Sequence, residues 1–202
     1  MEISGYEKNY RNLAPGLKDF DFASSCARLG LRETKDGAEI EFLGRLYRLS
    51  REGVEAADGE ASDPNFRSIL VHYALSQGEG GPGEEFLALF QLPGVMRGRN
   101  QGDNRSLLNG PMYERFGREG HDGFREAAGR LGGEYLGPHP AGGHLWEFRV
   151  LPRISLRVIY VEPDEEFPLE LNVLFDSHSP EILGFECLAF LQHCLSQALA
   201  SA

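Results

Sequence analysis

The sequence lacks a long apolar run and a recognisable leader. No stretch of the 202 residues approaches the roughly 20 consecutive apolar residues of a membrane-spanning helix. Residues 1–7 also lack the basic and apolar regions of a signal peptide. We therefore expect a cytoplasmic protein that does not insert into a membrane.

Cysteine is scarce as well. The three cysteines, Cys26, Cys187 and Cys194, fit reduced thiols better than a disulfide framework because their number is odd. On a helix, Cys187 and Cys194 would lie about 10.5 Å apart along the axis, too far to chelate one ion by themselves. The cofactor of this protein is left open, but this chain alone supplies no ligand set for an iron–sulfur cluster.

Basic residues are outnumbered by acidic ones, which gives a net charge of −11. Such a balance argues against nucleic acid as a partner and against docking on anionic membranes. Hydrophobic residues make up 41% and charged residues 25% of the chain, which is typical of globular proteins. We expect one domain over residues 1–202. Also absent are the nucleophile elbow, the His-Glu-x-x-His helix, the Cys-x-x-Cys pair and the EF-hand loop.

The pattern of apolar residues predicts an α+β fold. Residues 144–151, 154–161 and 169–175 alternate apolar and polar side chains, as strands with one covered face do. Their short connections favour a three-strand antiparallel meander, and residues 38–50 favour an N-terminal hairpin. Helices are expected to pack on this sheet: within the first 30 residues, from Pro64 towards Gly78, over 111–116 and 122–131, and from Ser179 onwards. Residues 52–62 are expected to form a loop.

The acidic turn between the last two predicted strands is the first candidate site. Asp164, Glu165 and Glu166 could bind a hard cation or raise one another's pKa. Consecutive side chains diverge, however, so the alternative is a solvated hairpin turn. These carboxylates form a site only if another part of the chain brings a ligand or a cation to that end of the sheet.

Asp176 and His178 form a second candidate, at a junction between a strand and a helix. They could ligate a metal or capture a ligand, or Asp176 could simply satisfy free amides at the helix start. The strand 168–175 spans roughly 25 Å. The acidic turn and Asp176 are therefore expected at opposite ends of it, in separate sites.

Two further candidates lie elsewhere in the chain. His72 flanks the buried stripe of a predicted helix and could be a general base, a metal ligand, an axial haem ligand or a half-buried structural histidine. Arg97, Arg99 and Arg105 cluster in a long glycine-containing loop and could hold a phosphate or a carboxylate. The alternative expectation is that this long loop is disordered.

Several short motifs follow one another in a fixed order along the chain: Phe42-Leu43-Gly44-Arg45-Leu46-Tyr47, Ile69-Leu70-Val71-His72-Tyr73, Leu151-Pro152, Asp164-Glu165-Glu166-Phe167-Pro168, Leu174-Phe175-Asp176 and Glu186. This order resembles a bacterial and archaeal family of domains of unknown function that is frequent in anaerobes. Some relatives are fused to an iron–sulfur segment, which the cysteines of this chain do not reproduce. The resemblance implies work beside metal or corrinoid cofactors in anaerobic metabolism.

Three hypotheses for function follow. We expect a non-catalytic accessory or binding protein in anaerobic metal or corrinoid cofactor metabolism, with a cofactor protein as a possible partner. The alternative is an enzyme on a small anionic substrate held by the arginine-rich loop, with His72 or an acidic residue as base. A scaffold that binds another protein through the sheet face of Ile159, Val161 and Leu174 is the third. Oligomeric state and ligand stay open.

Overall fold

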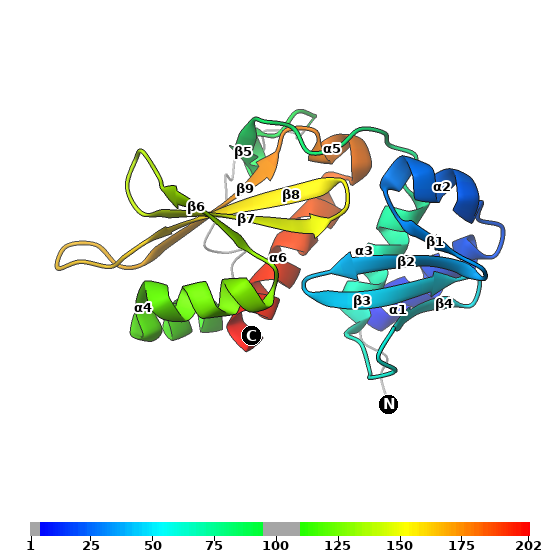
Figure 1. Cartoon of the computed structure of the whole chain (residues 1–202), viewed down its shortest axis with the longest axis horizontal. Helices are drawn as coiled ribbons and strands as arrows, with labels where there is room; N and C mark the ends of the chain where they lie inside the picture. The colour runs from blue at the N-terminus through cyan, green and yellow to red at the C-terminus, as the bar shows by residue number, and fades with distance from the viewer. Residues whose placement is uncertain (1–4, 95–109) are drawn as a thin grey trace.

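The chain folds into two lobes, each built on its own antiparallel sheet (Figure 1). The computed structural model describes residues 5–94 and 110–202. The N-terminal sheet has the order β1-β2-β3-β4, and the C-terminal sheet has the order β5-β9-β8-β7-β6. The strands are β1 Arg32–Thr34, β2 Gly37–Phe42, β3 Arg45–Ser50, β4 Gly53–Ala56, β5 Phe86–Ala88, β6 Glu134–Pro138, β7 His144–Leu151, β8 Ile154–Val161 and β9 Glu170–Asp176.

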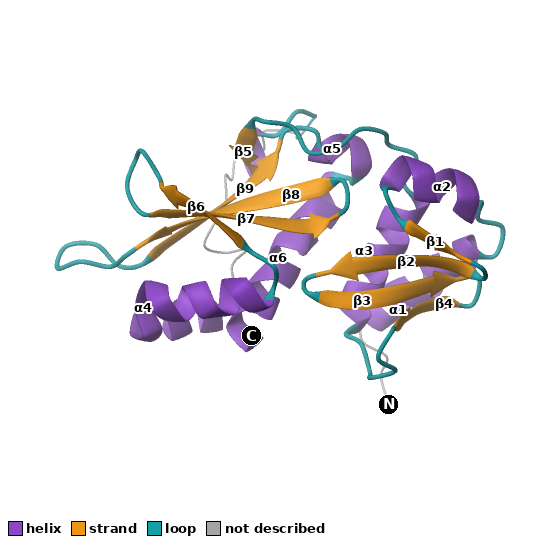
Figure 2. Cartoon of the chain, in the orientation of Figure 1, coloured by secondary structure: helices purple, strands orange, loops and turns teal. Residues whose placement is uncertain are grey.

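Helices pack against both sheets, as Figure 2 shows. In the N-terminal lobe, Asp21 accepts a hydrogen bond from the Ser24 amide at the start of one helix, and Gly30 ends that helix with φ 71°. Asp63 and Pro64 begin the next helix. The helices, with short 3-10 turns marked η, are α1 Gly5–Leu13, η1 Ala14–Leu17, α2 Phe22–Leu29, α3 Pro64–Leu75, η2 Leu89–Gln91, α4 Gly110–Arg130, α5 Ser179–Ile182 and α6 Phe185–Ser201.

The predicted α+β class, the C-terminal meander and the N-terminal hairpin are confirmed. Three details of the expectation were wrong. The hairpin belongs to a separate sheet; residues 53–56 form strand β4 rather than loop; and the helix near 111–116 continues to Arg130 instead of stopping at Gly117. Its break lies at Gly120, where φ is 67°. Strand β6 was not foreseen, because its side chains are mostly exposed and show no apolar alternation.

Tyr73 joins the two lobes. Its hydroxyl donates to the carbonyl of Leu29 at 2.7 Å and accepts from the amide of Arg153, in the β7–β8 turn, at 3.0 Å. The side chain is fully buried, and burial raises the pKa of its phenol well above the ordinary value. The buried apolar side chains of both lobes form one continuous cluster. Within residues 5–94 and 110–202, no helix combines the length and the apolarity that crossing a membrane requires.

Candidate metal centre

Two histidines and a glutamate meet at the end of the C-terminal sheet where β7 begins and β8 ends. His144 is the first residue of β7 and pairs with Tyr160 of β8, and Glu162 follows the last residue of β8. His121 comes from α4. One ligand atom from each of the three lies within 4.8 Å of the other two. Across the two described ranges, no other group of three or more histidine, cysteine or carboxylate ligands comes this close.

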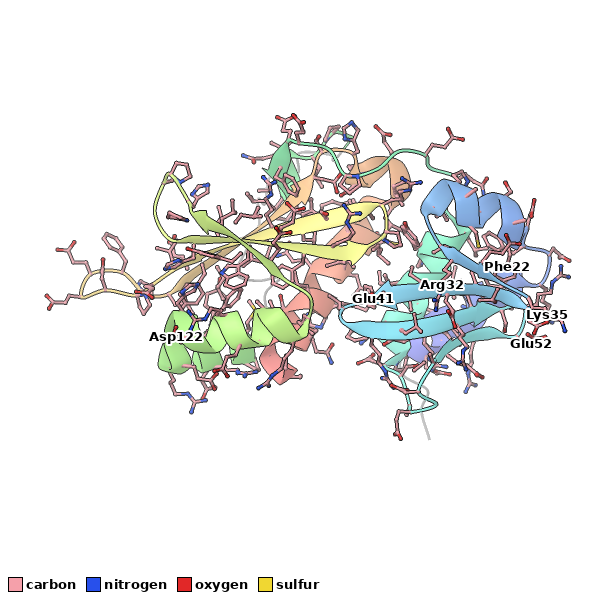
Figure 3. All side chains as sticks on the ribbon, in the orientation of Figure 1. Phe22, Arg32, Lys35, Glu41, Glu52 and Asp122 are labelled. Atoms are coloured by element: carbon pink, nitrogen blue, oxygen red, sulfur yellow. The ribbon has the colours of Figure 1, made fainter. Side chains whose placement is uncertain are left out.

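Helix α4 presents His121 to the sheet because aromatic side chains fix the helix on both sides of that residue. Phe116 and Phe124 are fully buried and pack edge to face at 5.1 Å, and Phe124 also contacts Trp146 at 5.9 Å. The hydroxyl of Tyr160 donates to the carbonyl of Phe116 at 3.2 Å. The break at Gly120 directly precedes His121. Figure 3 marks Asp122, the next residue, on α4 beside the protruding end of the sheet.

The two imidazoles are stacked on each other within an aromatic wall. Their ring centroids are 3.6 Å apart and their planes differ by 9°. The indole Nε1–H of Trp146 donates to Nε2 of His121 at 3.2 Å. The hydroxyl of Tyr135 lies 3.0 Å from Nδ1 of His144. One ring nitrogen of each histidine therefore has a hydrogen-bond partner: Trp146 for His121 and Tyr135 for His144.

The surroundings favour neutral imidazole at His121. Burial lowers the pKa of His121 below its ordinary value, and the adjacent His144 lowers it further, while Glu162 acts in the opposite sense. Burial, with Glu162 adding to it, raises the pKa of Tyr160 to about 12. A metal ion binds the neutral form of imidazole, so the lowered pKa of His121 favours metal binding at neutral pH.

Two imidazoles and one carboxylate form a donor set suited to a transition metal ion. Zinc, iron, nickel and cobalt accept this mixture, whereas calcium and magnesium prefer oxygen ligands alone. Three protein ligands also leave a coordination position for a further donor. Glu162 is exposed and the histidines are half-buried, so an ion or its carrier can reach the centre from solvent.

The acidic turn lies next to this centre but does not belong to it. The Asp164 carboxylate accepts from the amides of Glu166 at 2.8 Å and Phe167 at 2.7 Å, and Glu165 and Glu166 are exposed. This is the geometry of a solvated turn closed by an aspartate. The carboxylate that joins the two histidines is Glu162, two residues before the turn.

Asp176 lies at the other end of β9 and has a structural environment. Its fully buried carboxylate accepts from the Ser155 amide at 3.1 Å, the Ser179 hydroxyl at 2.8 Å and the His178 amide at 3.1 Å. These donors hold β8, β9 and α5 together and engage both oxygens. His178 itself is exposed. The separation of Asp176 from the acidic turn agrees with the strand length.

The remaining candidates within the described residues do not join the centre. His72 is half-buried in α3 of the N-terminal lobe, and burial lowers its pKa. Arg97, Arg99 and Arg105 lie outside the described residues, so their role as an anion site stays a prediction. Ile159 is buried and Val161 and Leu174 are half-buried, so a docking surface on these three side chains stays a prediction.

Sequence reasoning did not single out His121, His144 or Glu162. The sequence did contain one indication for His144 and Glu162. Antiparallel pairing of β7 with β8 across the Pro152-Arg153 turn places His144 opposite Tyr160, and therefore close to Glu162. The arrival of His121 depends on how α4 packs on the sheet, which no local pattern encodes.

The chain belongs to the family described as Domain of unknown function (DUF3786), whose match covers residues 21–198. No curated protein and no solved structure matches it significantly.

Proposed function

We propose that this chain is a non-catalytic accessory protein that binds a transition metal ion, or a metal-bearing cofactor such as a corrinoid, in anaerobic metabolism. The convergence of His121, His144 and Glu162 from three separate segments supports the proposal. Two of these ligands are histidines stacked on each other, and the lowered pKa of His121, caused mainly by burial, favours its neutral, metal-binding form.

The open coordination position argues against a purely structural metal site. A structural site is closed by four protein ligands, whereas this one offers three and can accept a further ligand. The fourth donor would come from solvent, from a partner protein or from the cofactor itself. His144 would bind the metal of such a cofactor through Nε2, since Nδ1 of the same ring faces Tyr135.

The test is metal binding by the purified, chelator-treated full-length chain. Cobalt(II) and zinc(II) are titrated separately and followed by calorimetry, and cobalt(II) also by its visible absorption. We expect one ion per chain and a loss of at least tenfold in affinity for Glu162→Gln and for His144→Ala. Hydroxocobalamin is titrated in parallel and followed by the shift of its absorption bands on imidazole ligation.

Glu165→Gln is the matched control, because it removes the same charge from the same connection three residues away. It should bind metal as the unmodified chain does. Equal losses in Glu162→Gln and Glu165→Gln would mean that the ion is attracted by the general negative charge of the turn. Absence of binding of both ions and of hydroxocobalamin to the unmodified chain would refute the proposed function.

A further inference from the structure

We propose that Trp146 sets the affinity of the metal centre by occupying the lone pair of His121 that an incoming ion needs. The inference rests on the proposed function and adds a second element to it: metal binding is coupled to the release of one buried hydrogen bond. Trp146 is a positioning residue here, since it contacts a ligand and not the ion.

The hydrogen bond fixes the tautomer of His121. An indole nitrogen only donates, so Nε2 of His121 must be unprotonated to accept from Nε1 of Trp146 at 3.2 Å. In the neutral ring the proton is then on Nδ1. The only in-plane lone pair of His121 is therefore the one that Trp146 holds.

Neither nitrogen of His121 can bind an ion while this bond persists. Coordination through Nε2 displaces the indole directly. Coordination through Nδ1 moves the proton to Nε2, where it would point at the indole N–H, a donor facing a donor. Both routes end the Trp146–His121 hydrogen bond.

The stacking of the imidazoles leads to the same conclusion independently. Because the rings are 3.6 Å apart and within 9° of parallel, their in-plane lone pairs lie in two separate planes that do not meet near the rings. One ion at a normal nitrogen–metal distance of about 2.1 Å needs lone pairs that converge on it. One ring must therefore turn. His121 is the ring whose hydrogen bond opposes the turn, whereas the hydroxyl of Tyr135 can act as donor or acceptor to His144.

Tyr135 and Trp146 thus have opposite effects on the centre. When His144 binds through Nε2, its Nδ1–H can donate to the Tyr135 hydroxyl, which holds the ring in place and favours binding. Trp146 is buried, with 3% of its surface exposed, so its released N–H is poorly solvated and opposes binding. The cost of breaking the Trp146–His121 hydrogen bond lowers the affinity for the ion and so keeps the ion exchangeable. This property suits a protein that passes a metal ion or a cofactor to a partner.

The experiment compares dissociation constants for zinc(II) in full-length variants. Trp146→Phe should bind zinc about tenfold more tightly, equivalent to about 1.4 kcal/mol, and Tyr135→Phe should bind it about tenfold more weakly. Tyr10→Phe is the control, because it removes a buried aromatic hydroxyl of the N-terminal lobe, which accepts from the Val54 amide and lies away from the centre. It should leave the affinity within about twofold.

A second readout needs no variant. Trp146 is the only tryptophan, so a ¹⁵N-labelled chain gives one indole N–H signal. Zinc should shift that signal to the position of a non-bonded indole, with a titration curve that matches the calorimetric one.

The outcomes separate the two proposals. If the unmodified chain binds no zinc, the proposed function fails for this ion. If it binds zinc with an unmoved indole signal, or if folded Trp146→Phe binds zinc equally or more weakly, the role of Trp146 is overturned while the metal centre stands.

Discussion

Replacing Tyr73 by phenylalanine tests whether one hydroxyl holds the two lobes together. The change removes a donor to the Leu29 carbonyl and an acceptor of the Arg153 amide, and keeps the ring. The bond to the Leu29 carbonyl is buried, whereas the bond from the Arg153 amide is only part-buried. An unsatisfied buried group costs about 1–3 kcal/mol and a part-buried one less, so we expect the free energy of unfolding to fall by about 2–4 kcal/mol.

The assay is urea unfolding followed by far-UV circular dichroism, with the free energy taken by linear extrapolation. Tyr160→Phe is the comparison, since that buried hydroxyl donates to the carbonyl of Phe116 within the C-terminal lobe. Its expected cost is about 1 kcal/mol. A loss in Tyr73→Phe no larger than that in Tyr160→Phe would refute the idea that both of its bonds stabilise the fold.

Three further predictions concern the break in α4, the buried aspartate and pH. Gly120→Ala should destabilise the fold by about 1–3 kcal/mol, because its φ of 67° and ψ of −168° lie in a region adopted almost only by glycine. Gly117→Ala, with open space around its Cβ position, should instead stabilise the fold by about 0.5–1 kcal/mol. Equal effects of the two substitutions in thermal melts would contradict this. Asp176→Ala should cost about 3 kcal/mol by leaving three donors unsatisfied, against less than about 1 kcal/mol for the exposed Asp164→Ala, as measured by urea unfolding. Burial lowers the pKa of His72 and His121 in the folded state, so the unfolded state takes up protons first and the free energy of unfolding should fall as pH drops below about 6.5. His72→Gln should make that fall shallower, and an unchanged slope would show that His72 does not contribute.

The parts of the fold that sequence predicts well are those with local signals. The meander follows from apolar alternation in residues 144–175, and the N-terminal hairpin from the turn near Gly44. Strand β6 has few buried side chains to produce an alternation, and β4 is only four residues long. Their assignment depends on pairing with neighbouring strands rather than on their own pattern.

The candidate centre was missed for a related reason. The acidic turn attracted notice because three carboxylates are adjacent in sequence, yet its aspartate is used to close the turn. Glu162, His144 and His121 are separated by 18 and 23 residues along the chain and meet only after β7 pairs with β8 and α4 packs on them. Adjacency in sequence was a poor guide to convergence in space.

The position of the single tryptophan gives this protein a built-in probe of cooperativity. Fluorescence from Trp146 reports on the C-terminal lobe alone, while circular dichroism averages over both lobes. If the Tyr73 link makes the lobes unfold together, the two signals will trace the same denaturation curve. If the two curves separate in Tyr73→Phe, the difference between their midpoints would measure how much each lobe is stabilised by its contact with the other.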